Sequence, residues 1–167
     1  MSNNAKIIIL RGNSGSGKTT IAHRLQKQLG RGTLLISQDV IRREMLWAND
    51  GADTKALPLL IDLVKYGSQH CEFVILEGIL NAKWYKELFE VILSEYGANI
   101  FAYYYDLPFE ETLQRHQTKP NCNDFGEDAM RRWWNDKDYI GIINEKSLTV
   151  GMSIDETVNM IMCDISK

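Results

Sequence analysis

A glycine-rich loop near the start of this 167-residue chain is flanked by an apolar run and an amphipathic segment. The run Ile7–Leu10 is continuous and mostly β-branched, which is typical of a strand buried on both faces of a parallel sheet. The loop GNSGSGKT follows at residues 12–19, and residues 17–29 predict a helix that ends at Gly30. Such a unit is suited to bind an anion, because the loop amides and the positive helix end face one point.

The loop matches in full the Walker A pattern, which holds the phosphates of a nucleoside triphosphate. Its glycines let main-chain N–H groups approach phosphate oxygens without a Cβ clash. We expect Lys18 to reach the β- and γ-phosphates and the Thr19 hydroxyl to ligate Mg²⁺. ATP and Mg²⁺ are therefore the expected cofactors. The predicted nucleotide-binding residues are Gly12, Asn13, Ser14, Gly15, Ser16, Gly17, Lys18, Thr19 and Thr20.

Strands and helices alternate along the rest of the chain, which predicts an α/β protein with a parallel sheet covered on both faces. No repeat or linker interrupts the pattern, so residues 1–167 are predicted to form a single domain. The polar segment 117–126 is expected to be a mobile loop. Strands are predicted at residues 33–36, 73–76, 100–105 and 148–150, and helices at 39–46, 57–66, 81–96, from Pro108, and after a Ser153–Glu156 capping box.

Composition is that of an ordinary globular protein, with 44% hydrophobic and 25% charged residues. The formal net charge of −3 gives no global field for binding nucleic acid, although a local basic cleft stays open as an alternative. Three widely spaced cysteines form no CxxC pair and indicate thiols in a reducing compartment. The N-terminal apolar run is too short for a signal or a membrane span, so we expect a cytoplasmic protein without a membrane partner.

Asp39 directly follows the second predicted strand, at the rim where ligands of parallel sheets bind. A carboxylate there can accept the proton of an attacking hydroxyl as a general base. Arg42 faces the same way one turn later and could hold the acceptor or an anionic group on it. The alternative is that Asp39 is only the N-cap of a short helix.

Two further residues are assigned to substrate binding. Glu77 closes the third predicted strand beside Gly78, where a carboxylate can handle substrate or magnesium-bound water. Its alternative is a solvent-exposed carboxylate on the rim. Trp47 is expected to wall the acceptor pocket, with an ordinary core aromatic as the alternative.

Basic residues surround the polar segment in the second half of the chain. Arg115 and Lys119 lie four residues apart, and Arg131 and Arg132 follow the loop. We predict that they form a small helical lid, at about residues 115–135, that closes over the γ-phosphate and excludes water. Solvated helix ends are the alternative. The predicted catalytic residues are Asp39, Lys18, Arg115 and Arg131.

The order of these motifs resembles the small P-loop kinases, and most of all the kinase domain of 5′-hydroxyl polynucleotide kinase. The similarity rests on the Walker A loop, on SQDVIR at residues 37–42, on YDLPF at residues 105–109 with Arg115, and on Arg131. Zeta-toxin kinases and chloramphenicol phosphotransferase look like more distant relatives. The segment EGIL at residues 77–80 is similar to enzymes of the uridine-kinase type.

The resemblance implies a three-layer P-loop NTPase fold with five strands in the order 2-3-1-4-5. It also implies that Asp39 is the general base, that Arg42 binds the acceptor side, and that adenine lies near the loop after Val150. The residues matching Arg115 and Arg131 serve the phosphates from the lid in that family. Lys119 stands where a further lid arginine would be.

The sequence therefore predicts a kinase that transfers the γ-phosphate of Mg-ATP to a hydroxyl of a small-molecule acceptor, which is a nucleoside, a sugar or antibiotic-like. A GTPase is disfavoured, because no DxxG motif follows the third predicted strand and no NKxD motif is present. Two alternatives stay open: a 5′-hydroxyl nucleic-acid kinase, and a non-catalytic or slowly hydrolysing switch that needs only the Walker A loop.

Overall fold

The structure is a computed structural model that describes residues 4–120 and 122–167. Residue 121, inside the loop predicted at 117–126, lies outside the described residues. The elements are β1 (Lys6–Gly12), α1 (Lys18–Leu29), β2 (Leu34–Ser37), the π-helix η1 (Val40–Met45), α2 (Ala56–His70), β3 (Phe73–Gly78), α3 (Lys86–Tyr96), β4 (Ile100–Tyr105), α4 (Phe109–Gln117), α5 (Glu127–Arg132), β5 (Glu145–Leu148) and α6 (Ile154–Ile165).

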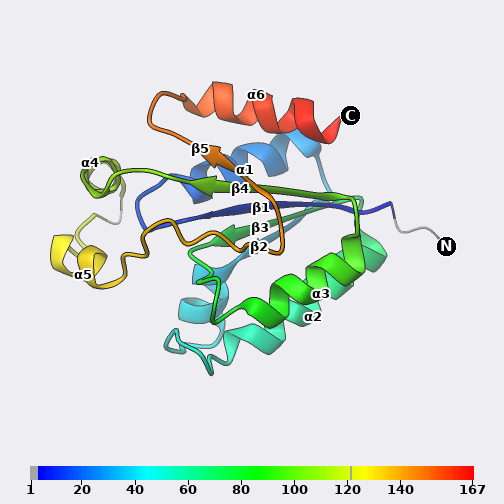
Figure 1. Ribbon diagram of the computed structural model, residues 1–167, viewed down its shortest axis with the longest axis horizontal. Coiled ribbons are helices and arrows are strands. Elements are labelled where there is room, and N and C mark those ends of the chain that lie inside the picture. Colours follow the sequence, from blue (N-terminus) through cyan, green and yellow to red (C-terminus); the bar gives the residue numbers. More distant parts are fainter. Residues whose placement is uncertain (1–3, 121) are drawn as a thin grey trace.

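Five parallel strands form one sheet in the order β2-β3-β1-β4-β5. In Figure 1, α1 and α6 cover one face of this sheet, α2 and α3 cover the other, and α4 and α5 lie beyond the ends of the strands. The three-layer P-loop NTPase fold with the strand order 2-3-1-4-5 is therefore confirmed.

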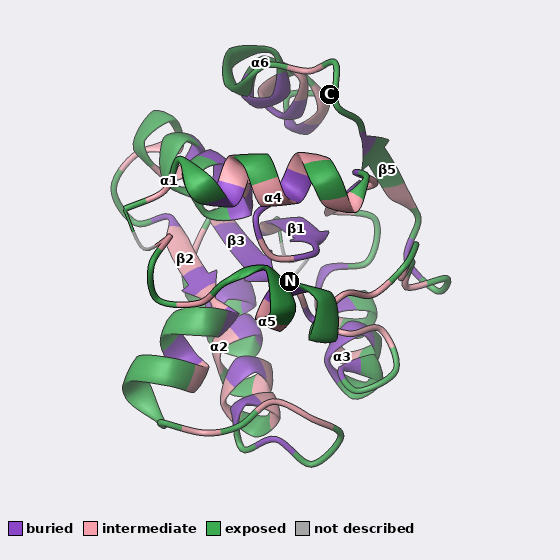
Figure 2. Cartoon of the chain, turned by 90° about the vertical axis from the view of Figure 1, so that its left-hand side faces the viewer, coloured by how far each residue is buried: buried purple, intermediate pink, exposed green. Residues whose placement is uncertain are grey.

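The core lies on both sides of β1. Ile7 and Ile9 pack into the cluster under α2 and α3, whereas Ile8 and Leu10 pack into the cluster under α1 and α6. All four side chains are fully buried, which is why the strand reads as an unbroken apolar run. In Figure 2 the central strands β1 and β3 are buried between helices whose outer faces are exposed.

The last strand differs from its prediction. It spans Glu145–Leu148 rather than residues 148–150 and pairs with β4 from Ala102 to Tyr105. This edge strand is mostly polar, so no apolar run marks it. The Glu145 side chain is nevertheless fully buried. Its burial is tolerated because its Oε1 accepts a hydrogen bond from Arg11 Nη1 at 2.8 Å.

Arg11 is a buried guanidinium at the end of β1, with 0% exposure. Its nitrogens donate to the carbonyl of Leu80, to the carbonyl and carboxylate of Asp138, and to the carboxylate of Glu145. The guanidinium also lies over the rings of Phe89 and Tyr104. A cation this well paired ties β1 to the β3–α3 loop and to the segment that leads into β5, which fixes the rim on which the site is built.

Two helices begin differently from their predictions. The segment predicted as a helix over 39–46 is a π-helix at Val40–Met45, with Leu46 N donating to Ile41 O at 3.0 Å. The helix predicted from Asn81 starts only at Lys86, because the Asn81 carboxamide accepts the N–H groups of Lys83 and Trp84 and closes a separate turn. π-Helices are rare in proteins, and those that do occur are often found at functional sites.

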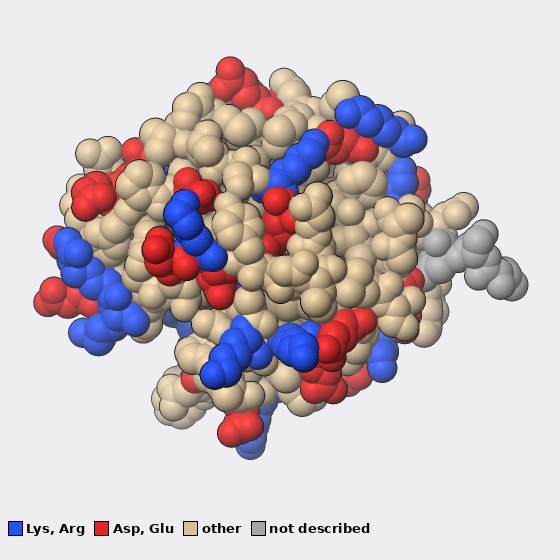
Figure 3. Space-filling model, viewed as in Figure 1, with Lys and Arg blue, Asp and Glu red and all other residues tan. Residues whose placement is uncertain are grey.

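Charges of both signs are interspersed over the face in Figure 3, as expected for a net charge near zero. None of the described helices is long and apolar enough to cross a membrane.

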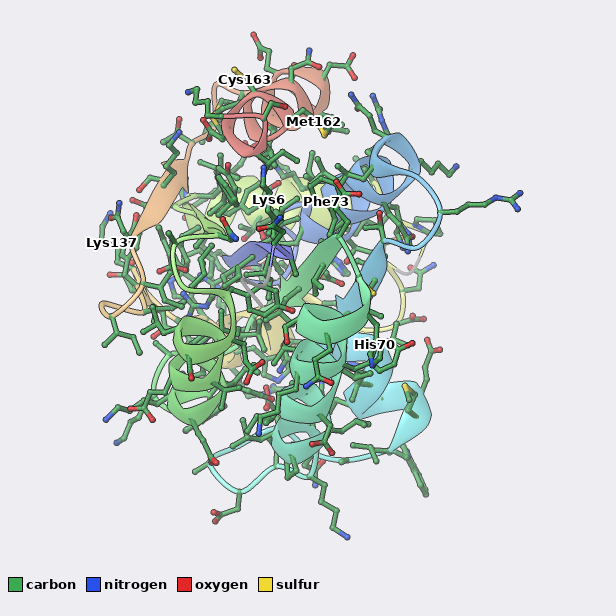
Figure 4. All side chains as sticks on the ribbon, turned by 90° about the vertical axis from the view of Figure 1, so that its right-hand side faces the viewer. Lys6, His70, Phe73, Lys137, Met162 and Cys163 are labelled. Atoms are coloured by element: carbon green, nitrogen blue, oxygen red, sulfur yellow. The ribbon has the colours of Figure 1, made fainter. Side chains whose placement is uncertain are left out.

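The strands begin at the opposite edge of the sheet from α4 and α5, where Lys6 and Phe73 lie side by side at the start of β1 and β3 (Figure 4). The rim formed by the strand ends is thus where a ligand is expected.

Candidate active site

The phosphate loop is packed closely beneath neighbouring elements. Gly12 has φ 149°, and a Cβ there would lie 2.8 Å from the Cβ of Tyr105. Gly15 has φ 84°, and a Cβ there would lie 2.4 Å from the carbonyl oxygen of Thr112 in α4. Figure 2 shows α4 crossing in front of the end of β1. The helix α4, which leads into the predicted lid segment, therefore packs on the loop itself, and only glycine fits at these two positions.

Lys18 lies inside the loop with 7% exposure. Its Nζ donates to the carbonyl of Asn13 at 2.9 Å and to Ser16 Oγ at 3.1 Å. Burial lowers the pKa of Lys18 from 10.5 to about 8, and the nearby Glu77 carboxylate opposes part of this shift. The ammonium is held by neutral oxygens, from which phosphate oxygens could take over its hydrogen bonds.

Thr19 and Glu77 form a small oxygen-rich corner beside the loop. The Thr19 hydroxyl donates to Glu77 Oε1 at 3.2 Å, and the Ser37 hydroxyl donates to the same oxygen at 2.6 Å. Glu77 is 3% exposed, so it is not the solvent-exposed rim carboxylate of the alternative interpretation.

Hydroxyl and carboxylate oxygens are the ligands that Mg²⁺ prefers, usually with waters and substrate phosphates completing the shell. No group of three or more His, Cys, Asp or Glu side chains that could hold a metal occurs in the described part of the chain. The donor set at Thr19 and Glu77 thus fits a nucleotide-bound Mg²⁺ rather than an independent metal centre.

A cavity of about 410 Å³ opens on one side of the phosphate loop. Ser16, Gly17 and Thr20 line it from the loop and α1, and Thr149, Met152 and other residues line it from the segment after β5. The resemblance places adenine in this region. The Tyr105 hydroxyl also belongs to this cavity and is buried without a hydrogen-bond partner among the described residues.

A second, larger cavity of about 1290 Å³ opens on the other side of the loop, where Ser14 contributes to its wall. Asp39, Arg42 and Trp47 all line it, so the structure brings these three predicted residues together. The rest of the wall includes Arg43, Asn49, Asp50, Ile79, Trp84, Phe125, Arg132, Trp133 and Asn135. The phosphate loop therefore lies between two cavities.

The Asp39 side chain is exposed and does not cap the helix that follows it. Its side chain is 61% exposed, makes no capping hydrogen bond, and lies 3.4 Å from Arg42 and 3.6 Å from Arg43. The interpretation of Asp39 as only an N-cap is therefore wrong. Its charge also acts on Lys18 and Lys119, whose pKa values it raises against the lowering effect of burial.

Arginines in the larger cavity keep unused donors. The Nε of Arg42 is buried without a partner among the described residues, and its two other contacts, to Ala48 O and Asp39, are long at 3.3 and 3.4 Å. The Arg132 side chain makes none of the hydrogen bonds or ion pairs found among the described residues. Arg43 lies over the rings of Phe125 and Trp133.

Aromatic rings stand at the rim of the same cavity. Trp47 is 93% exposed, so the alternative of a core aromatic is wrong. Its backbone has φ 48°, an unusual conformation for a bulky residue, and such strain is often found at functional sites. Trp84 and Trp133 are partly exposed, at 38% and 37%. Together with Trp47 they give this cavity three exposed or partly exposed indole rings, each from a different segment.

The predicted lid residues occupy different positions. Arg115 Nη1 donates to Ser16 O at 2.7 Å, while its Nε bonds Glu111 at 2.9 Å. Lys119 lines the nucleotide-side cavity, and burial lowers its pKa. Arg131 instead bonds Glu127 at 2.7 Å and lies 4.2 Å over the ring of Phe109, and it lines neither cavity.

Asn135 is a site residue that sequence reasoning missed. Its backbone N–H donates to Asn13 Oδ1 and its carbonyl accepts from Asn13 Nδ2, both at 2.7 Å. Its side-chain Oδ1 accepts from Asn81 Nδ2 at 3.1 Å. No motif signals this residue, because the contact joins positions more than a hundred residues apart.

Comparison with known proteins bears on both family and fold. The family described as AAA domain matches residues 7–136. None of the curated proteins matches the sequence. An APS kinase of Mycobacterium tuberculosis, solved with AMPPNP and APS, has a TM-score of 0.70 and 20% identity, with 98% of each chain covered.

Two other solved structures are similar over nearly their whole lengths. A tunicamycin resistance protein of Deinococcus radiodurans has a TM-score of 0.66 at 15% identity, and the match covers 97% of this chain and 96% of that protein's chain. A gluconokinase of Sinorhizobium meliloti has a TM-score of 0.63 at 15% identity, with coverages of 99% and 94%. At these identities the likeness establishes a common fold.

Proposed function

The chain belongs to the AAA-domain family, and on this premise we propose that it is an ATP-dependent kinase that phosphorylates a hydroxyl of a small-molecule acceptor. The observation that carries the proposal is the position of the phosphate loop between two cavities. Ser16 and Gly17 line the cavity assigned to the nucleotide, and Ser14 lines the cavity assigned to the acceptor. Transfer of a phosphoryl group in line needs donor and acceptor on opposite sides of the γ-phosphate. A switch protein has no need for the second cavity.

Asp39 is the proposed general base. It lies in the acceptor cavity, is exposed to it, and acts electrostatically on Lys18 beside the phosphates. Its carboxylate accepts the proton of the acceptor hydroxyl as the oxygen attacks the γ-phosphorus. The ion pairs with Arg42 and Arg43 orient the carboxylate.

Positive charge at the phosphates comes from three side chains in this proposal. Lys18 binds the β- and γ-phosphates, and Lys119 lies in the wall of the cavity assigned to the nucleotide. Arg115 donates to the carbonyl of Ser16 and so holds the loop in place. Thr19 and Glu77 would hold Mg²⁺, which would supply further positive charge at the phosphates. Residues 115–135 act as the lid that excludes water.

The acceptor cavity favours one class of alcohol among small molecules. Arg42 and Arg132 have donors free for a phosphate, sulfate or carboxylate, and Trp47 and Trp133 offer indole faces to a ring. An acceptor with an anionic group and a flat or ring-shaped part satisfies both.

A nucleic-acid end is the second candidate acceptor. The cavity of about 1290 Å³ exceeds the range of roughly 300–1,000 Å³ that is usual for small ligands, and aromatic rings with arginines are also suited to stacked bases. The overall charge of −3 disfavours a long polyanion. Mononucleotides and oligonucleotides in one screen separate the two candidates.

The test is a transfer screen with the full chain and Mg-ATP. Nucleosides, mononucleotides, oligonucleotides, sugars, sugar acids and aminoglycosides are each assayed by mass spectrometry for one added phosphoryl group. Thermal shift with Mg·AMPPNP ranks the candidates first, since saturation at 100 times Kd raises stability by about 2.7 kcal/mol. Phosphorylation of an anionic ring-bearing alcohol supports the proposal. ATP hydrolysis with no product from any class, unchanged in Asp39→Asn, supports the switch alternative instead.

A further inference from the structure

The side chain of Asn13 is hydrogen-bonded to a distant segment of the chain, although the residue belongs to the Walker A loop. Its carboxamide exchanges two hydrogen bonds with the backbone N–H and carbonyl of Asn135, each 2.7 Å long. Asn13 is 6% exposed, so water competes little for these groups. Only the Asn13 carbonyl faces the phosphate site, where it accepts from Lys18 Nζ and Ser16 Oγ.

Asn135 passes this contact on to the acceptor cavity. It lines that cavity itself, and its Nδ2 donates to the carbonyl of Trp133 at 3.2 Å. Its Oδ1 accepts from Asn81, whose own Oδ1 caps the turn that carries Trp84. Trp133 and Trp84 are two of the three indoles around the acceptor cavity. A continuous set of hydrogen bonds therefore joins the phosphate loop to two walls of that cavity.

The alternative to a connecting role is a ligand role, in which the Asn13 carboxamide binds nucleotide directly. Both of its polar atoms are already used by short hydrogen bonds, so direct binding would require breaking them. The main-chain groups of residue 13 do not depend on the side chain. Replacement by alanine therefore removes the connection and keeps the loop carbonyl that holds Lys18 and Ser16.

We propose that Asn13 is a positioning residue whose contact with Asn135 couples nucleotide binding at the phosphate loop to the shape of the acceptor cavity. The inference rests on the proposed function for the identity of the two cavities. A change in the loop at Asn13 moves Asn135 with it, and Asn135 bears on Asn81 and Trp133. Because coupling between two sites is reciprocal, an acceptor bound against these walls also strengthens nucleotide binding.

The experiment measures hydrogen exchange with Mg·AMPPNP as the only ligand, so it does not depend on knowing the acceptor. In the unchanged protein, the nucleotide is expected to slow exchange at least about fivefold in residues 133–135 and 81–85, which are remote from the phosphates along the chain. Asn13→Ala, measured at a concentration of Mg·AMPPNP that saturates the variant, is expected to lose the slowing in both segments.

Three further variants sharpen the result. Asn13→Asp keeps an acceptor for the Asn135 N–H but sets an anionic oxygen against the Asn135 carbonyl, so it too should lose the slowing, even if Asn13→Ala fails to fold. Asn81→Ala should lose it only in residues 81–85. Asn159→Ala, at an exposed position on α6, should behave as the unchanged protein.

Two outcomes overturn the proposal. If Asn13→Ala and Asn13→Asp keep the full nucleotide-dependent slowing in residues 133–135, the contact carries no coupling. If they lose nucleotide affinity by more than about tenfold while remaining folded, Asn13 is a nucleotide ligand and not a positioning residue. Failure of the kinase proposal is recognised separately, because it would leave this exchange pattern intact and show no phosphorylated product.

Discussion

Thr19 and Glu77 meet at the carboxyl edge of the sheet, where the Thr19 hydroxyl lies 3.2 Å from Glu77 Oε1 although 58 residues separate them. Thr19 follows the loop lysine at the start of α1, and Glu77 is the next-to-last residue of β3, which lies beside β1 in the sheet. The strand order 2-3-1 is what brings them together. This pair joins the nucleotide site to the proposed metal site and yields the first prediction.

Glu77→Gln is expected to raise the Mg²⁺ concentration needed for half-maximal phosphoryl transfer by about 10–100-fold, the usual effect of losing a group that supports a metal. The amide keeps the shape of the side chain but loses the charge. Affinity for AMPPNP without Mg²⁺ should change little. Magnesium titrations of both proteins check this, with Glu90→Gln on the exposed face of α3 as the control. An unchanged Mg²⁺ requirement would remove Glu77 from the metal site.

Asp39→Asn is expected to lower acceptor phosphorylation by about 10²–10⁴-fold, which is what a positioned general base contributes. Stability should change little, because the Asp39 side chain caps no helix and its ion pairs are largely exposed. Nucleotide affinity should stay nearly intact. Steady-state transfer with the acceptor found in the screen is compared with AMPPNP binding by calorimetry. Normal transfer in the variant would rule out Asp39 as the base.

The sequence predicted most of the sheet, and the place of the Walker A loop between β1 and α1, for a physical reason. Strands such as β1 are buried on both faces and read as apolar runs, and the Walker A loop is contiguous, so local pattern suffices. Ser153 and Glu156 form the predicted capping box at α6, again a local feature.

The remaining features depend on contacts between distant segments. β5 was misplaced because its Glu145 is buried only through pairing with Arg11, which the linear pattern cannot reveal. Asn135 was missed because its partner Asn13 lies far away in the chain. Trp47 lies just after the π-helix and is 93% exposed, and side-chain periodicity over six residues does not distinguish a π-helix from an α-helix.

Lys18 gives the protein a pH dependence whose sign can be derived. Its pKa is about 8 in the folded chain and ordinarily 10.5, so the unfolded chain binds more protons between these two pH values. Stability without nucleotide should therefore rise as the pH increases from about 8 to 10.5, and the cost of burying the charge is complete below pH 8.

Nucleotide affinity should move in the opposite direction, because phosphates favour the protonated ammonium. Affinity for Mg·AMPPNP is expected to weaken between pH 8 and pH 9, with uptake of protons on binding. Calorimetry in buffers of different ionisation enthalpy measures that uptake. Burial also lowers the pKa of Lys119, so Lys119→Met isolates the part due to Lys18. Equal affinities at pH 7 and pH 9 in this variant would contradict the assignment.

Arg131 and Arg132 are neighbours that provide a matched pair for testing the acceptor cavity. Arg131 was predicted to be catalytic, but its guanidinium bonds Glu127 and covers Phe109 outside both cavities. Arg132 lines the proposed acceptor cavity, and its side chain has no hydrogen bond or ion pair among the described residues. If the acceptor is anionic, Arg132→Ala should raise its KM by about 10–100-fold, the loss of one charged hydrogen bond of roughly 1.5–3 kcal/mol. The stability of Arg132→Ala should stay within about 0.5 kcal/mol of the unchanged protein, as for other exposed residues.

Arg131→Ala should leave KM nearly unchanged, because the residue reaches neither ligand in this arrangement. Steady-state kinetics on the same acceptor, together with thermal unfolding of both variants, separate the two roles. A larger loss of kcat in Arg131→Ala than in Arg132→Ala would show that the lid closes further during transfer and brings Arg131 to the phosphates, as the family resemblance implies.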